Sequence, residues 1–177
     1  NDPGVRVRYQ LAFTLGESPS ASEHPEAYSS LVIQDGGNSW VRLALLSSLN
    51  QGSAGVLASL LDTEGYGANA DQVKFMEQLA MLAGTTGRED DVKLVVAAAE
   101  TLTTSNSKLA QGLVRGLIDG LQKAPNSAAA QDVLANSTIA KAIVATMTAN
   151  ALKTVVDDKQ KEANRITAIK VLTLLPY

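Results

Sequence analysis

The chain has 177 residues, of which 45% are hydrophobic, 19% charged and 4% aromatic, the size and composition of one soluble globular domain. Its 15 basic and 18 acidic residues give a net charge of −3, which argues against nucleic acid as a partner because nothing attracts a phosphate backbone. Cysteine is absent, which excludes disulfides, thiolate metal sites and a cysteine nucleophile.

Apolar residues recur at helical spacing along the chain, and clusters of Gly, Pro, Asn and Asp separate the segments. The pattern predicts about ten helices in roughly five antiparallel pairs, without a strand. They are expected over residues 3–16, 24–33, 39–49, 53–61, 69–83, 89–103, 107–123, 128–135, 137–156 and 159–175. Because no run of 18 apolar residues occurs and the N-terminus lacks a signal-peptide pattern, no membrane span is predicted in this segment.

Residues 7–16 recur as residues 41–50, with Val, Arg and two Leu in register at a period of 34 residues. The stretch between the copies has room for one more helix and a turn. A two-helix unit repeated at such a period is typical of an α solenoid, in which each unit buries its apolar face against its neighbours. We therefore expect a single repeat domain over residues 1–177. Both ends are apolar, which favours a segment of a longer multidomain protein.

Residues 2–8, followed by Leu11-Ala12 and Leu15-Gly16, resemble the second helix of a HEAT-like repeat. In that family an Asp at the turn and an Arg about six positions later form a ladder between adjacent units. Asp2 and Arg8 have this spacing. The later copies depart from it, because Arg42 has Gly36 at the matching position and Arg165 has Asp158 seven residues before it.

Three segments taken together point to a narrower group of proteins. They are Val-Arg-x-Gln-Leu-Ala-x-Thr-Leu-Gly-Glu at residues 7–17, Trp-Val-Arg-x-Ala-Leu-Leu-Ser-Ser-Leu at 40–49, and Arg-Ile-x-Ala-Ile-x-x-Leu at 165–172. They resemble the HEAT-like region of large secreted planctomycete-type proteins, which join a sugar-dehydrogenase-like β-propeller to such repeats and a haem c domain. No haem function carries over, because the attachment motif needs two Cys.

The resemblance implies an all-α, right-handed superhelix of about five helical pairs, of the HEAT or armadillo type. It also implies a non-catalytic scaffold within a larger, extracytoplasmic, dehydrogenase-like protein. The partners would be neighbouring domains of the parent chain or another protein. The sequence gives no oligomeric state.

The residues that could carry chemistry favour no catalytic, cofactor or metal site. His24 is the only histidine and lacks a ligand at helical spacing, so an exposed loop or capping role is favoured over metal binding. Asp90-Asp91 and Asp157-Asp158 are expected as solvated caps. Oxygen ligands also surround a glycine loop, where loop solubility is favoured and a weak Ca²⁺ site is the alternative. These ligands are Asp62, Glu64, Asn69 and Asp71.

The candidate interaction surface combines the single tryptophan, two arginines and a glycine stripe. Trp40 is expected to pack against the preceding helix, and an exposed anchor is the alternative. The arginines are expected to pair between repeats, with a basic edge as the alternative. Since glycine costs a helix about 1 kcal/mol against Ala, the stripe indicates close approach of a neighbouring helix, or else of a partner. The residues are Trp40, Arg8, Arg42, Gly112, Gly116 and Gly120.

Two rival functions differ in what a structure should contain. An autonomous peptide- or protein-binding module predicts an exposed apolar or charged groove that includes Trp40 or the glycine helix. An enzyme or carbohydrate-binding helical domain needs carboxylates and aromatics on one face, with Asp62, Asp71 and Tyr66 around one deep pocket, and the 4% aromatic content argues against it.

Overall fold

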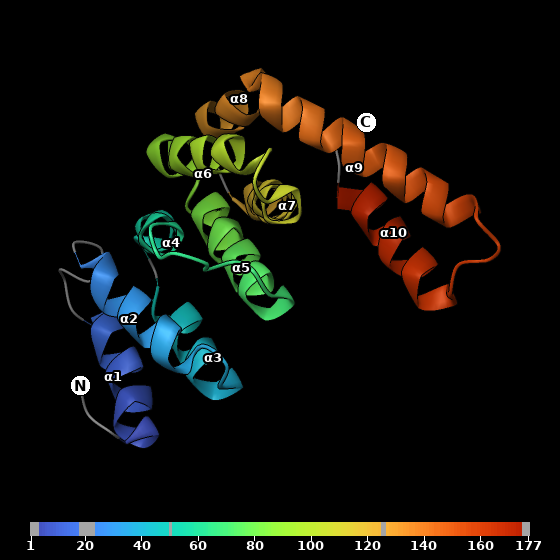
Figure 1. Ribbon diagram of the computed structural model, residues 1–177. Coiled ribbons are helices and arrows are strands. Elements are labelled where there is room, and N and C mark those ends of the chain that lie inside the picture. Colours follow the sequence, from blue (N-terminus) through green and yellow to red (C-terminus); the bar gives the residue numbers. More distant parts are fainter. Residues whose placement is uncertain (1–3, 18–23, 50, 125–126, 175–177) are drawn as a thin grey trace.

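The computed structural model describes residues 4–17, 24–49, 51–124 and 127–174. Over these residues the chain is all-helical, with ten helices and no strand (Figure 1). They are α1 (Val5–Glu17), α2 (Pro25–Asp35), α3 (Ser39–Ser48), α4 (Ser53–Leu61), α5 (Ala70–Thr86), α6 (Glu89–Leu102), α7 (Ser107–Lys123), α8 (Ala128–Asn136), α9 (Thr138–Val156) and α10 (Glu162–Leu174).

Helices that are two apart in the chain pack side by side, which gives two layers. In one layer α1 contacts α3 and α5 contacts α7, while in the other α2, α4, α6 and α8 follow one another. Consecutive helices, such as α4 and α5 or α6 and α7, connect the layers. The long α9 and the shorter α10 form a pair at the other end of the molecule from α1 (Figure 1). This arrangement is compatible with an α solenoid.

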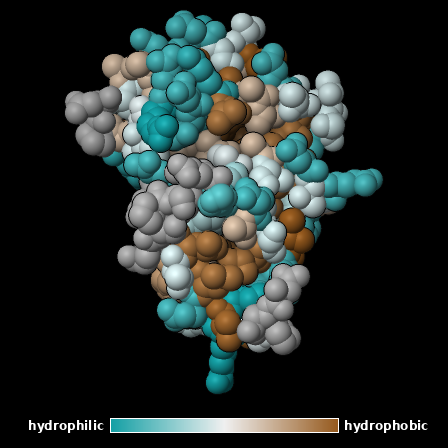
Figure 2. Space-filling view, turned by 90° about the vertical axis from the view of Figure 1, so that its left-hand side faces the viewer, coloured by the Kyte–Doolittle hydropathy of each residue, from teal (hydrophilic) through white to brown (hydrophobic). Residues whose placement is uncertain are grey.

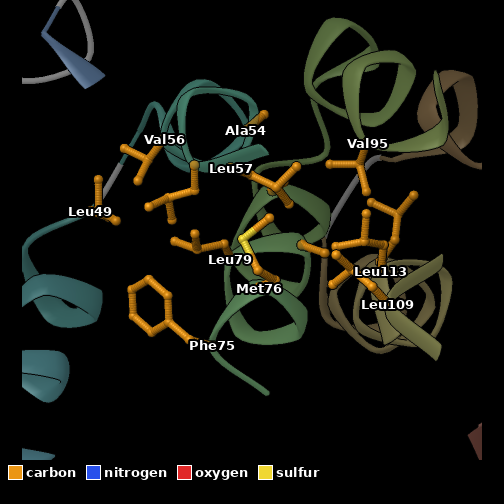
Figure 3. Packing of buried hydrophobic residues seen from close by; sticks show 14 of the residues in the cluster. Leu49, Ala54, Val56, Leu57, Phe75, Met76, Leu79, Val95, Leu109 and Leu113 are labelled. Carbon is orange, nitrogen blue, oxygen red and sulfur yellow. The ribbon is translucent and has the colours of Figure 1, made fainter. Parts of the chain in front are cut away.

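One cluster of buried apolar side chains runs between the layers, from Ala12 of α1 to Met147 of α9. Figure 3 shows its centre, where Met76 and Leu79 of α5 lie between Leu57 of α4 and Leu113 of α7. Each helix buries only the stripe that faces its neighbours, and these stripes together form one continuous, elongated core of mostly aliphatic side chains.

Polar side chains set where several helices begin. The side-chain oxygen of Asn38 accepts hydrogen bonds from the backbone N–H groups of Trp40 (3.0 Å) and Val41 (3.4 Å). Asn69, Asn106 and Ser137 accept equivalent bonds at the starts of α5, α7 and α9. Such caps satisfy donors that have no partner inside the helix.

The predicted boundaries differ from the observed ones most at α5 and α10. The helix α5 continues three residues past the expected end at Ala83 and ends where Gly87 adopts the left-handed conformation at φ 64°. The helix α10 begins at Glu162 instead of residue 159. The proposed cap Asp2 and first-turn Pro3 lie outside the described residues.

Candidate functional site

Exposed apolar side chains gather on α1 and α3, which pack side by side. On α3, Trp40 and Leu43 are 68% and 60% exposed, and on α1, Val7 and Leu11 are 52% and 44% exposed. We call these four residues the α1–α3 surface. Figure 2 shows hydrophobic side chains concentrated over the part of the molecule where α1 and α2 lie. Exposed aromatic and aliphatic anchors of this kind are typical of binding surfaces.

Trp40 is therefore not packed against the preceding helix as expected. The buried positions of α3 are Val41, Ala44, Leu45 and Ser48, which follow helical spacing. Trp40 is out of phase with that stripe. Trp40 precedes the buried Val41 by one residue, so it points about 100° around the helix from Val41, and the indole faces solvent.

The repeat explains why the exposed residues of α1 are unusual. Val7 and Leu11 correspond across 34 residues to Val41 and Leu45, which are 1% and 0% exposed in α3. The same side chains are thus buried in the second copy and open in the first. The helix α1 therefore has the same apolar stripe that α3 buries against its neighbours, but no helix among the described residues covers the stripe of α1.

The first arginine of the repeat forms a link between helices. Arg8 of α1 donates from Nη2 to Asp35 Oδ1 at 2.9 Å and from Nε to Oδ2, and Asp35 ends α2. Both side chains are largely buried. The hydrogen bonds from Arg8 hold the pKa of the Asp35 carboxyl below its ordinary value of 3.8. The expected partner of Arg8, Asp2, lies outside the described residues.

The other two arginines do not repeat this link. The position 34 residues after Asp35 is Asn69, a neutral side chain that caps α5, and no ion pair of Arg42 occurs within the described part of the chain. Instead Arg42 lies near Tyr66, whose pKa burial raises to about 12 against the opposing effect of the arginine charge. Arg165 donates to the carbonyl of Val155 at 3.0 Å and reaches the exposed Asp158 only at 3.9 Å.

The glycine stripe is covered by α5, so it is not open to a partner on that side. A Cβ on Gly116 would overlap the carbonyl oxygen of Glu77, and one on Gly120 would overlap that of Met81. Gly84 of α5 faces Gly120 in return. Gly112 has more room, since its nearest neighbour would be Val73 Cγ1 at 3.5 Å. The stripe allows α5 and α7 to make the most extensive helix contact in the molecule.

Two adjoining hollows lie beside this contact. The first, of about 520 Å³, lies between α5 and α7, and the second, of about 480 Å³, lies between α7 and the α9–α10 pair. They share Val73, Lys108 and Arg115 as lining residues, so they are adjacent, and we call the two together the groove. The binding-module hypothesis predicted an exposed groove that includes the glycine helix, and Gly112 and Gly116 line these hollows, but the sequence did not indicate which other residues line them.

At the centre of the groove Arg115 and Glu77 make a bidentate ion pair between α7 and α5. Arg115 donates from Nε to Glu77 Oε1 at 2.7 Å and from Nη2 to Oε2. These hydrogen bonds raise the pKa of Arg115 above its ordinary value, which keeps it protonated. The pair fixes the two helices in register where the glycines allow close approach.

The residues considered for chemistry do not converge on one pocket. Tyr66 and Asp71 line a hollow of about 270 Å³ between α2 and α5, but Asp62 does not. His24 begins α2 without a capping bond, and its Nδ1 lies 3.2 Å from Glu26 Oε1 at the surface. Within the described ranges no three His, Cys, Asp or Glu side chains group as metal ligands.

One expected solvated cap is buried instead. Asp91, in the first turn of α6, accepts a hydrogen bond from the Thr86 hydroxyl at 3.0 Å and lies 3.8 Å from Arg88. This contact ties the end of α5 to the start of α6. Asp157 keeps a local capping role, accepting from the Lys159 N–H at 3.0 Å.

The helix α9 is long and apolar enough to cross a membrane by length and composition alone, although no such segment was expected. Only 22% of its apolar window is buried within the molecule. Helices of soluble proteins meet the same criterion, and α9 carries Lys141 and Lys153.

No family model matches the sequence, and no match was found among curated proteins or solved structures.

Proposed function

We propose that the chain is a non-catalytic, HEAT-like scaffold of a larger, extracytoplasmic, dehydrogenase-like protein. In this proposal its two layers wind as a right-handed superhelix, and a further helical pair of the parent protein stacks on the exposed stripe of α1 that contains Val7 and Leu11. An enzyme is the weaker alternative because Asp62, Asp71 and Tyr66 do not surround one pocket.

The observation that carries the proposal is the contrast between the two copies of the repeat. Val7 and Leu11 are about half exposed where Val41 and Leu45 are buried. Burying an aliphatic side chain is worth about 1.5–3 kcal/mol, so a helix that covered this stripe would gain substantially. The repeat itself supplies the chemistry of the occupant, which is another apolar helix of the same kind.

The HEAT-type assignment is supported by the Arg8–Asp35 pair. An Asp at an inter-helix turn, bound to an Arg of the preceding unit, matches the ladder that the resemblance implies. The position equivalent to Asp35 in the next unit is Asn69, which lacks the charge, and this agrees with the departure of the later copies from the Asp–Arg spacing.

The 177 residues contain no cysteine, so a thiol introduced into them is identified by its labelled peptide, which gives a test of the covered surface. In a Leu11→Cys variant of the natural full-length protein, we expect maleimide to label the thiol more slowly than in the isolated 177-residue chain. Lys93→Cys on α6 is the control, and it should label equally fast in both.

The second part of the test is the sequence encoded on either side of the 177 codons. Helical-repeat sequence before residue 1 and a Cys-x-x-Cys-His motif elsewhere would support the parent. Equal labelling of Leu11→Cys in both proteins would rule out a helix stacked on α1, and start and stop codons flanking the 177 codons would rule out a scaffold inside a larger chain.

A further inference from the structure

The groove along α5, α7 and the α9–α10 pair has unequal charge. Its lining contains three basic side chains, Lys74, Lys108 and Arg115, and two acidic ones, Glu77 and Asp119. Both acids already have partners: Glu77 binds Arg115, and Asp119 accepts from Lys123 Nζ at 2.9 Å.

The two lysines that remain have no acidic partner at ion-pair distance in the part of the chain that the structure describes. Lys74 lies on α5, and Lys108 lies on the first turn of α7, where both hollows meet. Both side chains are exposed. The groove therefore presents uncompensated positive charge on a molecule whose net charge is −3.

The rest of the lining suits a polypeptide backbone. The amide side chains of Gln111 on α7 and Asn150 on α9 face the second hollow, and neither is engaged in a side-chain hydrogen bond within the described ranges. An amide can donate and accept at once, which matches a peptide group. Val73, Met147 and Val171 supply apolar surface between the polar groups.

We propose that this groove binds an extended, acidic polypeptide segment, with its carboxylates on Lys74 and Lys108 and its backbone on Gln111 and Asn150. The inference does not depend on the α1–α3 surface. A peptide of about ten residues, at about 3.3 Å per residue, would span the steps of about 10 Å between neighbouring helices.

An acidic peptide fits better than a nucleic acid. Each nucleotide adds a phosphate charge, and strong binding would require many basic contacts, whereas the groove offers only two free lysines. A peptide with carboxylates at intervals needs few charges and can use the amides and the apolar surface for the rest.

The test uses a fluorescein-labelled peptide of about ten residues in which Glu and Ser alternate, titrated with the whole chain at low salt and followed by fluorescence anisotropy. We expect saturable binding that weakens as salt is raised. The same peptide with Gln in place of Glu should bind much more weakly. Lys108→Glu and Lys74→Glu should each raise the Kd about five- to tenfold.

Lys141→Glu is the matched control, since Lys141 is an exposed lysine of α9 that lines a different hollow, and its Kd should stay within about twofold. Circular dichroism confirms that each variant is folded. Equal binding of the Glu and Gln peptides, equal loss in Lys141→Glu and Lys108→Glu, or preference for a single-stranded oligonucleotide of equal charge would overturn the proposal. So would no binding at a chain concentration of about 1 mM.

Discussion

At the scale of single residues, the Arg8–Asp35 pair should make stability depend on acid pH. Asp35→Asn removes the charge that compensates the largely buried guanidinium, so we expect the free energy of unfolding to fall by about 3 kcal/mol at neutral pH. The folded pKa of Asp35 is lowered, so its stabilisation is present above the ordinary value of 3.8 and is lost as the pH falls through the lower folded value. Urea unfolding as a function of pH measures both effects.

The control for this prediction is Asp158→Asn. Asp158 is exposed and only 3.9 Å from Arg165, so its loss should change stability by less than about 0.5 kcal/mol. If Asp35→Asn were as mild, or if its stability fell with acid as steeply as that of the natural chain, the pair would not hold α1 to α2.

Predictions for single residues agreed with the structure where the repeat, or a run of glycines that lets helices approach closely, marked the residue. The arginine of the first copy does pair between helices, and the glycine stripe does admit a neighbouring helix. The partner Asp35 was not predicted, because the 34-residue recurrence shows which residues of the two copies are equivalent but not which inter-helix turn lies next to Arg8. Packing of Trp40 was favoured and an exposed anchor was the alternative; Trp40 is exposed because it lies one position off the buried stripe that begins at Val41.

At the scale of helices, the contact between α5 and α7 should be sensitive to a single methyl group. In Gly116→Ala the added Cβ would overlap the backbone of Glu77, which can move only if the helices separate. Overpacking of this kind costs about 1–3 kcal/mol, and it outweighs the gain of about 1 kcal/mol in helix propensity. Thermal unfolding should show a lower midpoint.

Gly112→Ala provides the internal comparison on the same helix. Its Cβ would make an ordinary contact at 3.5 Å with Val73, so the propensity gain should leave the midpoint unchanged or raised. A midpoint for Gly116→Ala at or above that of Gly112→Ala would mean that α5 and α7 do not pack at the glycines.

The helices themselves were largely predictable, because apolar periodicity and polar separators mark each one. The expected contacts between consecutive helices occur, as between α4 and α5, α6 and α7, and α9 and α10, and contacts between alternate helices stack these units into layers. The sequence did not show which contact would be the most extensive. The α5–α7 contact depends on glycine positions on both helices, and the sequence revealed only the stripe on α7 clearly.

At the scale of the whole molecule, the core is uneven along the stack. The helices α5 and α7 bury long runs of side chains, while α9 buries four residues and α10 buries Ala168. Ala151 and Ala168 lie outside the main apolar cluster. The α9–α10 pair faces α7 across a hollow of about 480 Å³, so its attachment depends on fewer buried contacts.

We therefore expect the α9–α10 pair to open before the rest of the array. In repeat proteins each unit is stabilised by its neighbours, so a unit with little buried surface unfolds locally at lower cost. Hydrogen exchange followed by mass spectrometry should show faster exchange in peptides from residues 148–174 than in those from α5 and α7. A saturating acidic peptide should slow exchange in α10 but leave α1 unaffected, because the groove includes α10 and not α1. Uniform protection from α5 through α10 would instead mean that the pair is bound to α7 as firmly as α7 is to α5.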